Sequence, residues 1–198
     1  MNQLSYQIED RLYLNITDRC TLGCTFCPKN NGSMDLHEYD LSLDHRPTAA
    51  EVIASIDDIS AYSEFVFCGY GEPTLRLDVL LEVAKYIKEH GGKVRINTDG
   101  LANLVHKRNV LPELGKYVDS LSVSMNAQNE EIYNRHCLPA LSGSYQAMLE
   151  FLRLAPHYIK HVSASALDGL EGVDIQACEQ IAADCGVRFK KRRLGVVG

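Results

Sequence analysis

The stretch Cys20-Thr-Leu-Gly-Cys24-Thr-Phe-Cys27 places three thiols within eight residues, in the spacing CxxxCxxC. It follows a short apolar run, Leu12-Tyr-Leu-Asn-Ile16, so the thiols are expected on the loop that leaves the end of a strand. Three cysteines are one fewer than a closed structural zinc site uses, and one fewer than the thiolates that usually hold an iron–sulfur cluster. The pattern therefore predicts a metal centre with an open position, where a small molecule can bind.

The composition limits the classes to which the chain can belong. Its 198 residues are enough for one domain, 1–198, with a substantial core, and 45% hydrophobic and 23% charged residues are ordinary for a soluble globular protein. The net charge of −6 argues against a general nucleic-acid binder. Seven cysteines, an odd number, do not suggest a disulfide framework. In a reducing compartment clustered cysteines are typically metal-binding or catalytic.

The N-terminal stretch 1–10 has no basic region followed by an apolar segment, and no apolar run approaches the length that spans a membrane. We therefore expect a cytoplasmic protein that has no signal peptide and makes no membrane contact.

Strand-like and helix-like segments alternate about six times along the chain. The expected strands are Leu12–Ile16, Glu64–Gly69, Lys93–Asn97, Val118–Ser124, His161–Ala166 and Val187–Lys190. The expected helices are Thr48–Ser60, Leu77–Ile87, Asn103–Tyr117 with an interruption at Pro112, Glu130–Cys137, Ser144–Leu154 and Asp174–Cys185. Between the cysteines and the first helix, Pro28–Pro47 reads as a long loop with an extended piece around Leu41–Leu43, of the kind that covers a site.

This alternation predicts an α/β protein with a parallel sheet. Right-handed crossovers would put every helix on one side of a curling sheet, and six units instead of eight predict an open, partial, TIM-barrel-like barrel. In such barrels the carboxyl ends of the strands form one rim, which holds the active site. The cysteine loop and the polar turns Gly69–Pro73, Asn97–Gly100 and Ser124–Asn126 all fall at that rim.

Two simpler interpretations of the cysteines remain open at this point. The first is a structural zinc site, for which His37 or His45 could supply the fourth ligand, although no second CxxC or HxxxH pair lies nearby. The second is three buried thiols without metal, which a glycine-containing loop makes improbable.

The motif CxxxCxxC after the first strand, with the aromatic Phe26 before its last cysteine, resembles the cluster motif of the radical S-adenosylmethionine (radical SAM) superfamily. Gly69-Tyr-Gly-Glu-Pro73 resembles that family's Gly-Gly-Glu-Pro turn, with Tyr70 in place of the first paired glycine. Asn97-Thr-Asp-Gly100 resembles the Asp-Thr-Asn-Gly stretch of glycyl-radical activating enzymes, with the acid and the amide exchanged. Ser122-Val-Ser-Met-Asn126 resembles the superfamily's fourth-strand motif.

The resemblance implies a 4Fe–4S cluster held by Cys20, Cys24 and Cys27, with S-adenosylmethionine (SAM) on the fourth iron. Reductive cleavage of SAM would give a 5′-deoxyadenosyl radical that abstracts hydrogen from a substrate, and the protein would bind and orient the cofactors. An external one-electron donor of the flavodoxin or ferredoxin type is implied as a partner. The substrate, a small molecule or a protein loop, is not identified, and neither is any catalytic residue. A nucleic-acid partner is not expected.

The same resemblance assigns contacts to SAM. The backbone at Gly69 and Gly71 would pass the methionine amino group, and Glu72 would accept from its ammonium; the alternative for Glu72 is a carboxylate at a helix start. Asn97, Ser124 and Asn126 would contact the ribose or the carboxylate; alternatively, they satisfy backbone groups at strand ends. Phe26 would contact the adenine through its backbone, or else pack in the core.

Among small relatives, the chain looks most like a subgroup associated with TatD-type nucleases. The alternatives are a glycyl-radical activating enzyme, a small heterocycle-forming radical SAM enzyme and, from another class, a zinc-stabilised binding module.

Two further features stand outside these motifs. Cys68, Cys178 and Cys185 are expected to be buried as small hydrophobes, whereas Cys137 could line the site or be inert. The basic run Arg188–Arg193 is expected to be a solvated sheet edge, with contact to an anionic substrate as the alternative.

Overall fold

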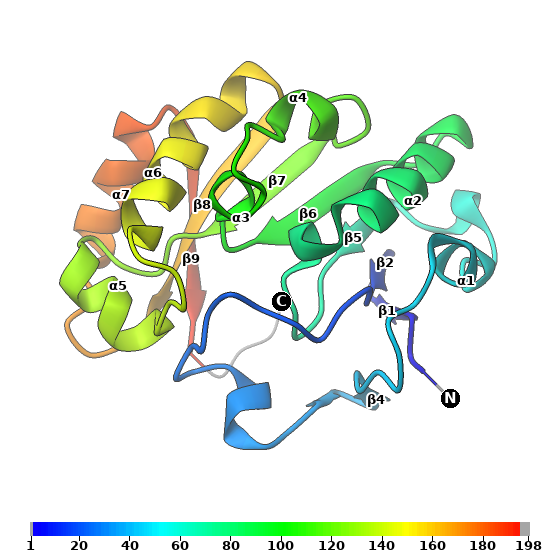
Figure 1. Cartoon of the computed structure of the whole chain (residues 1–198), viewed down its shortest axis with the longest axis horizontal. Coiled ribbons are helices and arrows are strands. Elements are labelled where there is room, and N and C mark those ends of the chain that lie inside the picture. The colour runs from blue at the N-terminus through cyan, green and yellow to red at the C-terminus, as the bar shows by residue number, and fades with distance from the viewer. Residues whose placement is uncertain (1, 195–198) are drawn as a thin grey trace.

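A seven-stranded sheet is the centre of the computed structural model, which describes residues 2–194 (Figure 1). Its strands are β1 (Ser5–Ile8), β2 (Arg11–Leu14), β5 (Glu64–Phe67), β6 (Val94–Thr98), β7 (Ser120–Ser124), β8 (His161–Asp168) and β9 (Arg188–Arg193). They lie in the order β1-β2-β5-β6-β7-β8-β9, and all neighbouring pairs are parallel except β1 with β2. The strands β1 and β9 form the two ends of the order, so the barrel is open.

Helices connect the parallel strands. They are α1 (Ala49–Ala54), α2 (Leu77–Glu89), α3 (Ala102–His106), α4 (Leu111–Leu114), α5 (Glu130–Cys137), α6 (Ser144–Leu154) and α7 (Ile175–Asp184), with the 3-10 turns η1 (Pro28–Asn31), η2 (Ile59–Ala61), η3 (Pro73–Arg76) and η4 (Ala155–His157). The expected caps are present: Thr48 and Glu51 form a capping box before α1, and Asp174 accepts from Ala177 N at the start of α7. No helix within residues 2–194 has both the length and the apolar character to cross a bilayer.

The two faces of the sheet differ because alternate residues of a strand point to opposite sides. The side that faces the helices is apolar; Phe65, Ile96, Val123 and Ala164 lie there in the main core. Figure 1 shows α2, α3, α4, α6 and α7 gathered along this side. We call the opposite side of the sheet the open face. This arrangement confirms the predicted α/β partial barrel with parallel strands.

The long segment 28–47 covers one half of the open face. It contains a two-stranded ribbon, β3 (Asp35–Leu36) with β4 (Tyr39–Asp40), where a loop was expected. Leu36 and Leu41 pack in a second apolar cluster with Tyr13 of β2 and Val66 of β5. The extended piece therefore lies at 35–40 and not at Leu41–Leu43. This difference arises because the ribbon is stabilised by its packing on the sheet, which local sequence does not show.

Three further expectations need correction. The first helix ends at Ala54 and not at Ser60, and η2 follows it. The helical segment 103–117 is broken at Lys107, which has a positive φ of 52°, whereas Pro112 lies in the first turn of α4, where proline is favoured. Strand β1 was not expected; its antiparallel pairing with β2 extends the sheet by one strand.

Candidate functional site

Four polar segments converge at one edge of the sheet. The cysteine loop follows β2, Gly69–Pro73 follows β5, Asn97–Gly100 closes β6, and Ser124–Asn126 closes β7. Since β2, β5, β6 and β7 are parallel neighbours, their carboxyl ends lie at the same edge. The convergence predicted from the sequence is therefore present in the fold.

The cysteine loop is fixed by its backbone to the end of α5. Gly23 N donates to Cys137 O at 3.0 Å, and Thr25 N donates to His136 O at 2.9 Å. These bonds satisfy carbonyls that the last turn of a helix leaves without intrahelical partners. The backbone of the cysteine loop is thus anchored to the last turn of α5.

The three thiols of the motif have different surroundings. Cys20 is exposed, whereas Cys24 and Cys27 are half-buried. The Cys24 thiol is hydrogen-bonded to Cys137, which raises the pKa of Cys24, and burial adds to this rise. Accepting that bond lowers the pKa of Cys137. A metal that binds Cys24 must therefore displace a proton and separate this thiol from Cys137.

No three His, Cys, Asp or Glu side chains within residues 2–194 lie close enough to share one metal ion. His45, a possible fourth ligand of a zinc site, is bonded to Glu51 at 2.8 Å. A 4Fe–4S cluster needs no such convergence, because each thiolate binds a different iron of a larger body.

The carboxylate of Glu72 links two of the polar segments at the ends of the strands. It is 3% exposed and accepts four hydrogen bonds. They come from Thr74 N (3.0 Å), Thr74 Oγ1 (2.6 Å), Thr98 Oγ1 (2.9 Å) and Asp99 N (2.7 Å). Glu72 thereby links the turn after β5 to the end of β6. It also caps η3, in agreement with the alternative interpretation of Glu72 as a carboxylate at a helix start. Burial, with the charge of Asp99 adding to it, raises the pKa of Glu72 to about 8.

The two glycines beside Glu72 are required by the chain segment that leads into the cysteine loop. A Cβ on Gly71 would lie 2.2 Å from Thr17 O, and one on Gly69 would lie 2.6 Å from Asn15 Oδ1. Glu72 N also donates to Arg19 O at 2.7 Å. Only glycine allows these close approaches. The contact of Gly69, Gly71 and Glu72 with SAM stays a prediction.

A second link joins the loop to β6. The Thr21 hydroxyl donates to Asp99 Oδ2 at 2.5 Å, and Asp99 Oδ1 accepts from Leu101 N at 2.9 Å. Asp99 is 6% exposed, so these bonds replace the water that its carboxylate has lost. Asp99 lies within the quoted Asn97–Gly100 motif, but its link to Thr21 joins residues 78 positions apart and has no local signal.

The remaining predicted rim residues lie along β6 and β7. Asn97 accepts from Arg95 Nη1 at 3.1 Å, and Ser124 is half-buried at the end of β7. Asn126 is 2% exposed and has a positive φ of 63°, a conformation that asparagine tolerates. Its amide donates to Cys137 Sγ at 3.6 Å, and its Oδ1 accepts from Arg192 Nη2 at 2.7 Å. Their roles toward SAM stay predictions.

The outcomes for the other singled-out residues differ. Cys178 and Cys185 are buried, as expected, and Phe26 is half-buried against the main core. Cys68 is half-buried and packs on the open face beside the second apolar cluster. Cys137 is completely buried against Cys24 and Asn126. The solvated-edge interpretation of the basic run is wrong for Arg192, which turns inward to Asn126.

Tyr133 is a rim residue that sequence reasoning missed. It lies on α5 one turn before Cys137, is 0% exposed, and its hydroxyl has no hydrogen-bond partner within the described chain. Burial raises the pKa of Tyr133, and the charges of Cys137 and Asp99 add to this rise. A buried hydroxyl without a partner costs about 1–3 kcal/mol. Three loop thiols and an unsatisfied donor beside them fit a cofactor that brings its own acceptor atoms.

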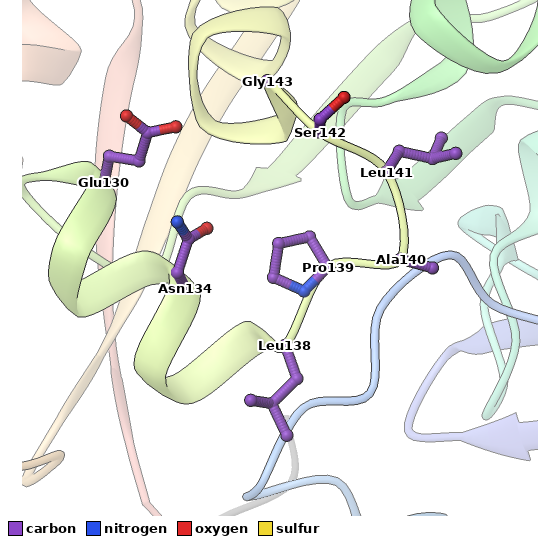
Figure 2. A pocket seen from close by; sticks show the side chains of 8 residues that line it. All are labelled: Glu130, Asn134, Leu138, Pro139, Ala140, Leu141, Ser142 and Gly143. Carbon is purple, nitrogen blue, oxygen red and sulfur yellow. The ribbon is translucent and has the colours of Figure 1, made fainter.

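A cavity of about 410 Å³ lies outside this rim. Figure 2 shows it between the exposed side of α5 and the turn that leads to α6, lined by Glu130, Asn134, Leu138–Gly143. None of the predicted cofactor-binding residues lines it. The cavity is therefore not the site that the rim residues form.

The comparison with known families agrees with these motifs and this fold. The model of the radical SAM superfamily matches residues 14–185. The chain belongs to the radical SAM superfamily. The superfamily's enzymes use a 4Fe–4S cluster and SAM, and the protein is accordingly an enzyme with these cofactors.

Individual relatives are more distant. The dual-specificity RNA methyltransferase RlmN of Halorhodospira halophila is 26% identical over 128 residues, covering 59% of this chain and 32% of that protein. The GTP 3′,8-cyclase of Limosilactobacillus fermentum is 31% identical over 136 residues, covering 64% of this chain and 36% of that protein. The chain thus spans about a third of the length of these relatives. The structure of TYW1 with a lysine-pyruvate adduct superposes with a TM-score of 0.67 at 13% identity, over 95% of this chain and 66% of that one.

Proposed function

We propose that the protein binds one 4Fe–4S cluster through Cys20, Cys24 and Cys27 and cleaves SAM reductively. The single observation that carries the proposal is the position of the three thiols at the carboxyl edge of the parallel strands, next to the turns after β5, β6 and β7. When bound, the cofactors supply a 5′-deoxyadenosyl radical that abstracts hydrogen from the substrate. The protein's part is to bind, orient and exclude water.

Each group of rim residues has a distinct task in this proposal. Gly69, Gly71, Glu72, Asn97, Ser124 and Asn126 contact or position SAM, together with the backbone at Phe26. Glu72 acts through the segments it joins, because its four hydrogen bonds leave little capacity for a ligand. Segment 28–47 covers the half of the open face formed by β2 and β5, and this cover would limit the access of water to the site.

Several finer assignments are part of the same proposal. The chain folds as one radical SAM core domain and works in the cytoplasm, a proposal consistent with seven free cysteines. It receives electrons from a flavodoxin- or ferredoxin-type donor. The narrower likeness to the TatD-associated subgroup stays a prediction. A glycyl-radical activating enzyme and a heterocycle-forming enzyme remain the alternative reactions.

Anaerobic reconstitution with iron and sulfide tests the proposal. We expect a brown protein with the visible absorbance of iron–sulfur thiolate ligation, which releases 5′-deoxyadenosine from SAM after reduction with dithionite. C24A should lose both properties. C178A, which removes a thiol buried in α7, should retain both and is the matched control. A colourless, zinc-replete protein without cleavage would instead support the zinc-stabilised binding module.

A further inference from the structure

The half of the open face formed by β6 to β9 is polar, in contrast to the half that segment 28–47 covers. The strand register aligns its side chains in cross-strand rows. One row contains Asn97, Ser122, Ser163 and Arg188, and the next contains Ser124, Ser165 and Lys190. Most of these side chains are half-buried or exposed. Serine hydroxyls can both donate and accept, so this surface suits a polar ligand.

Arg192 lies at the rim end of this surface, beside Leu167 in the register. Its Nη2 donates to Asn126 Oδ1 at 2.7 Å, whereas its Nε is buried and has no partner within residues 2–194. No carboxylate in that range forms an ion pair with it. Burial lowers the pKa of Arg192, and only thiolate charges on Cys68, Cys24 or Cys137 would oppose this decrease.

Two nearby cations, by contrast, each have a carboxylate partner. Lys191 points to the other side of the strand and pairs with Asp168 at 3.3 Å. On the open face, Arg95 pairs with Glu64 at 2.8 Å. A largely buried guanidinium without an anion carries a desolvation cost that these two cations do not. The Nε–H group of Arg192, which has no partner within residues 2–194, is of the kind that binds carboxylate and phosphate oxygens.

We propose that the β6–β9 half of the open face binds the substrate, that the substrate carries a carboxylate or a phosphate, and that Arg192 binds this oxyanion. The assignment of this ligand as the substrate rests on the proposed function. The oxyanion site itself does not, because it follows from a guanidinium whose buried Nε has no partner, and which forms no ion pair with a carboxylate, within residues 2–194. The serine rows would then contact the polar body of the ligand, and Asn126 would orient Arg192 between the substrate and the cysteine loop.

Thermal unfolding of the reconstituted protein tests the site, with inorganic phosphate and acetate as probes against chloride at equal ionic strength. An anion that binds the folded state raises its midpoint temperature. We expect phosphate or acetate to raise it in the wild type and in K191Q, the adjacent control on the opposite face. In R192Q the affinity for the anion should fall about tenfold or more. R192K should keep part of the affinity, because lysine keeps the positive charge but lacks the planar pair of N–H donors of a guanidinium. An equal response of R192Q and wild type, or no anion-specific response in wild type, would overturn the proposal.

The carboxylate of SAM is the other possible source of an oxyanion, and direct binding measurements distinguish it. SAM and its decarboxylated analogue are titrated into wild type and R192Q without reductant. If Arg192 binds the substrate's oxyanion, phosphate does not compete with SAM. R192Q then changes the affinity for SAM and the affinity for decarboxylated SAM by the same factor. A loss in R192Q that is confined to SAM, together with competition by phosphate, would overturn the assignment to the substrate. Neither measurement needs SAM cleavage, so failure of the proposed function would appear separately.

Discussion

The hydroxyl of Thr21 lies 2.5 Å from Oδ2 of Asp99, and this contact joins the cysteine loop to the end of β6. Asp99 in turn donates its backbone N–H to Glu72 at 2.7 Å, so the loop, the turn after β5 and the end of β6 are linked in one buried chain of hydrogen bonds. Breaking one link should therefore loosen the position of the thiols as well as cost stability.

Replacement of Thr21 by valine tests this link, because valine has nearly the same shape and lacks the hydroxyl. Asp99 Oδ2 would lose its donor in a buried place, so the free energy of unfolding of the metal-free protein should fall by about 1–3 kcal/mol. The reconstituted variant should also release iron faster in air. T25V is the control, since Thr25 is exposed and its hydroxyl makes only a 3.4 Å contact with His136 O. Equal iron release by the two variants would contradict the link.

Glu72 should make the stability of the metal-free protein depend on pH. Its pKa rises from an ordinary value of 4.5 to about 8 on folding, so the folded state binds the proton more tightly than the unfolded state. The stabilising contribution is therefore complete below about pH 4.5 and is lost as the pH rises to about 8. Urea unfolding at pH 5, 6, 7 and 8 should show a decrease of at most about 1.4 kcal/mol per pH unit from this group.

Glu72→Gln is the matched test of that dependence. The variant should be less stable at every pH, because an amide NH₂ in place of Oε2 cannot accept the hydrogen bond from Asp99 N. Its stability should nevertheless vary less between pH 5 and pH 8, since the titrating group is gone. A variant with the same slope as the wild type would assign the pH dependence to another residue.

Tyr133→Phe should have different effects on the metal-free and on the reconstituted protein. Without metal, loss of the unpartnered buried hydroxyl should raise the free energy of unfolding by about 1 kcal/mol. With the cluster bound, the hydroxyl can donate to a sulfur atom, and a lost hydrogen bond to sulfur disfavours the reduced cluster. The ratio of reduced to oxidised cluster at a fixed potential should fall roughly two- to tenfold.

Tyr145→Phe is the control for that experiment. Tyr145 packs against Tyr133 with ring centroids 5.5 Å apart, yet the thiols that affect its pKa are those of Cys178 and Cys185. Electron paramagnetic resonance of the poised proteins reports the reduced fraction. Equal shifts in both variants would show that ring packing, and not the Tyr133 hydroxyl, affects the cluster.

Leu138 should be a site at which stability can be gained. It ends α5 with a positive φ of 44°, which a leucine side chain disfavours, and it is 51% exposed. Leu138→Asn should therefore raise the free energy of unfolding by about 1 kcal/mol, because asparagine tolerates this conformation. Leu141→Asn, which removes another exposed leucine without a positive φ, should give no such gain by urea unfolding.

The sequence alone determined the features that depend on local pattern. Alternation of β-formers and amphipathic stretches predicted the six parallel strands in order, and α5 and α6 have the predicted bounds. The spacing of Cys20, Cys24 and Cys27, with the turn that contains Glu72, was sufficient to predict the superfamily. These features are readable because strand and helix periodicity, caps and loop motifs are encoded within a few residues.

Only the tertiary structure decided which side chains outside the motifs reach the site. Tyr133 and Cys137 come to the rim because α5 accepts the backbone of the cysteine loop, and Thr21 meets Asp99 across 78 positions. The position of Arg192 likewise depends on the register of β9 beside β8, since a shift of one residue would turn it to the opposite face. Whether a buried charge or hydroxyl has a hydrogen-bond partner depends on residues that the fold brings to it from distant positions. Local sequence patterns do not show which residues these are.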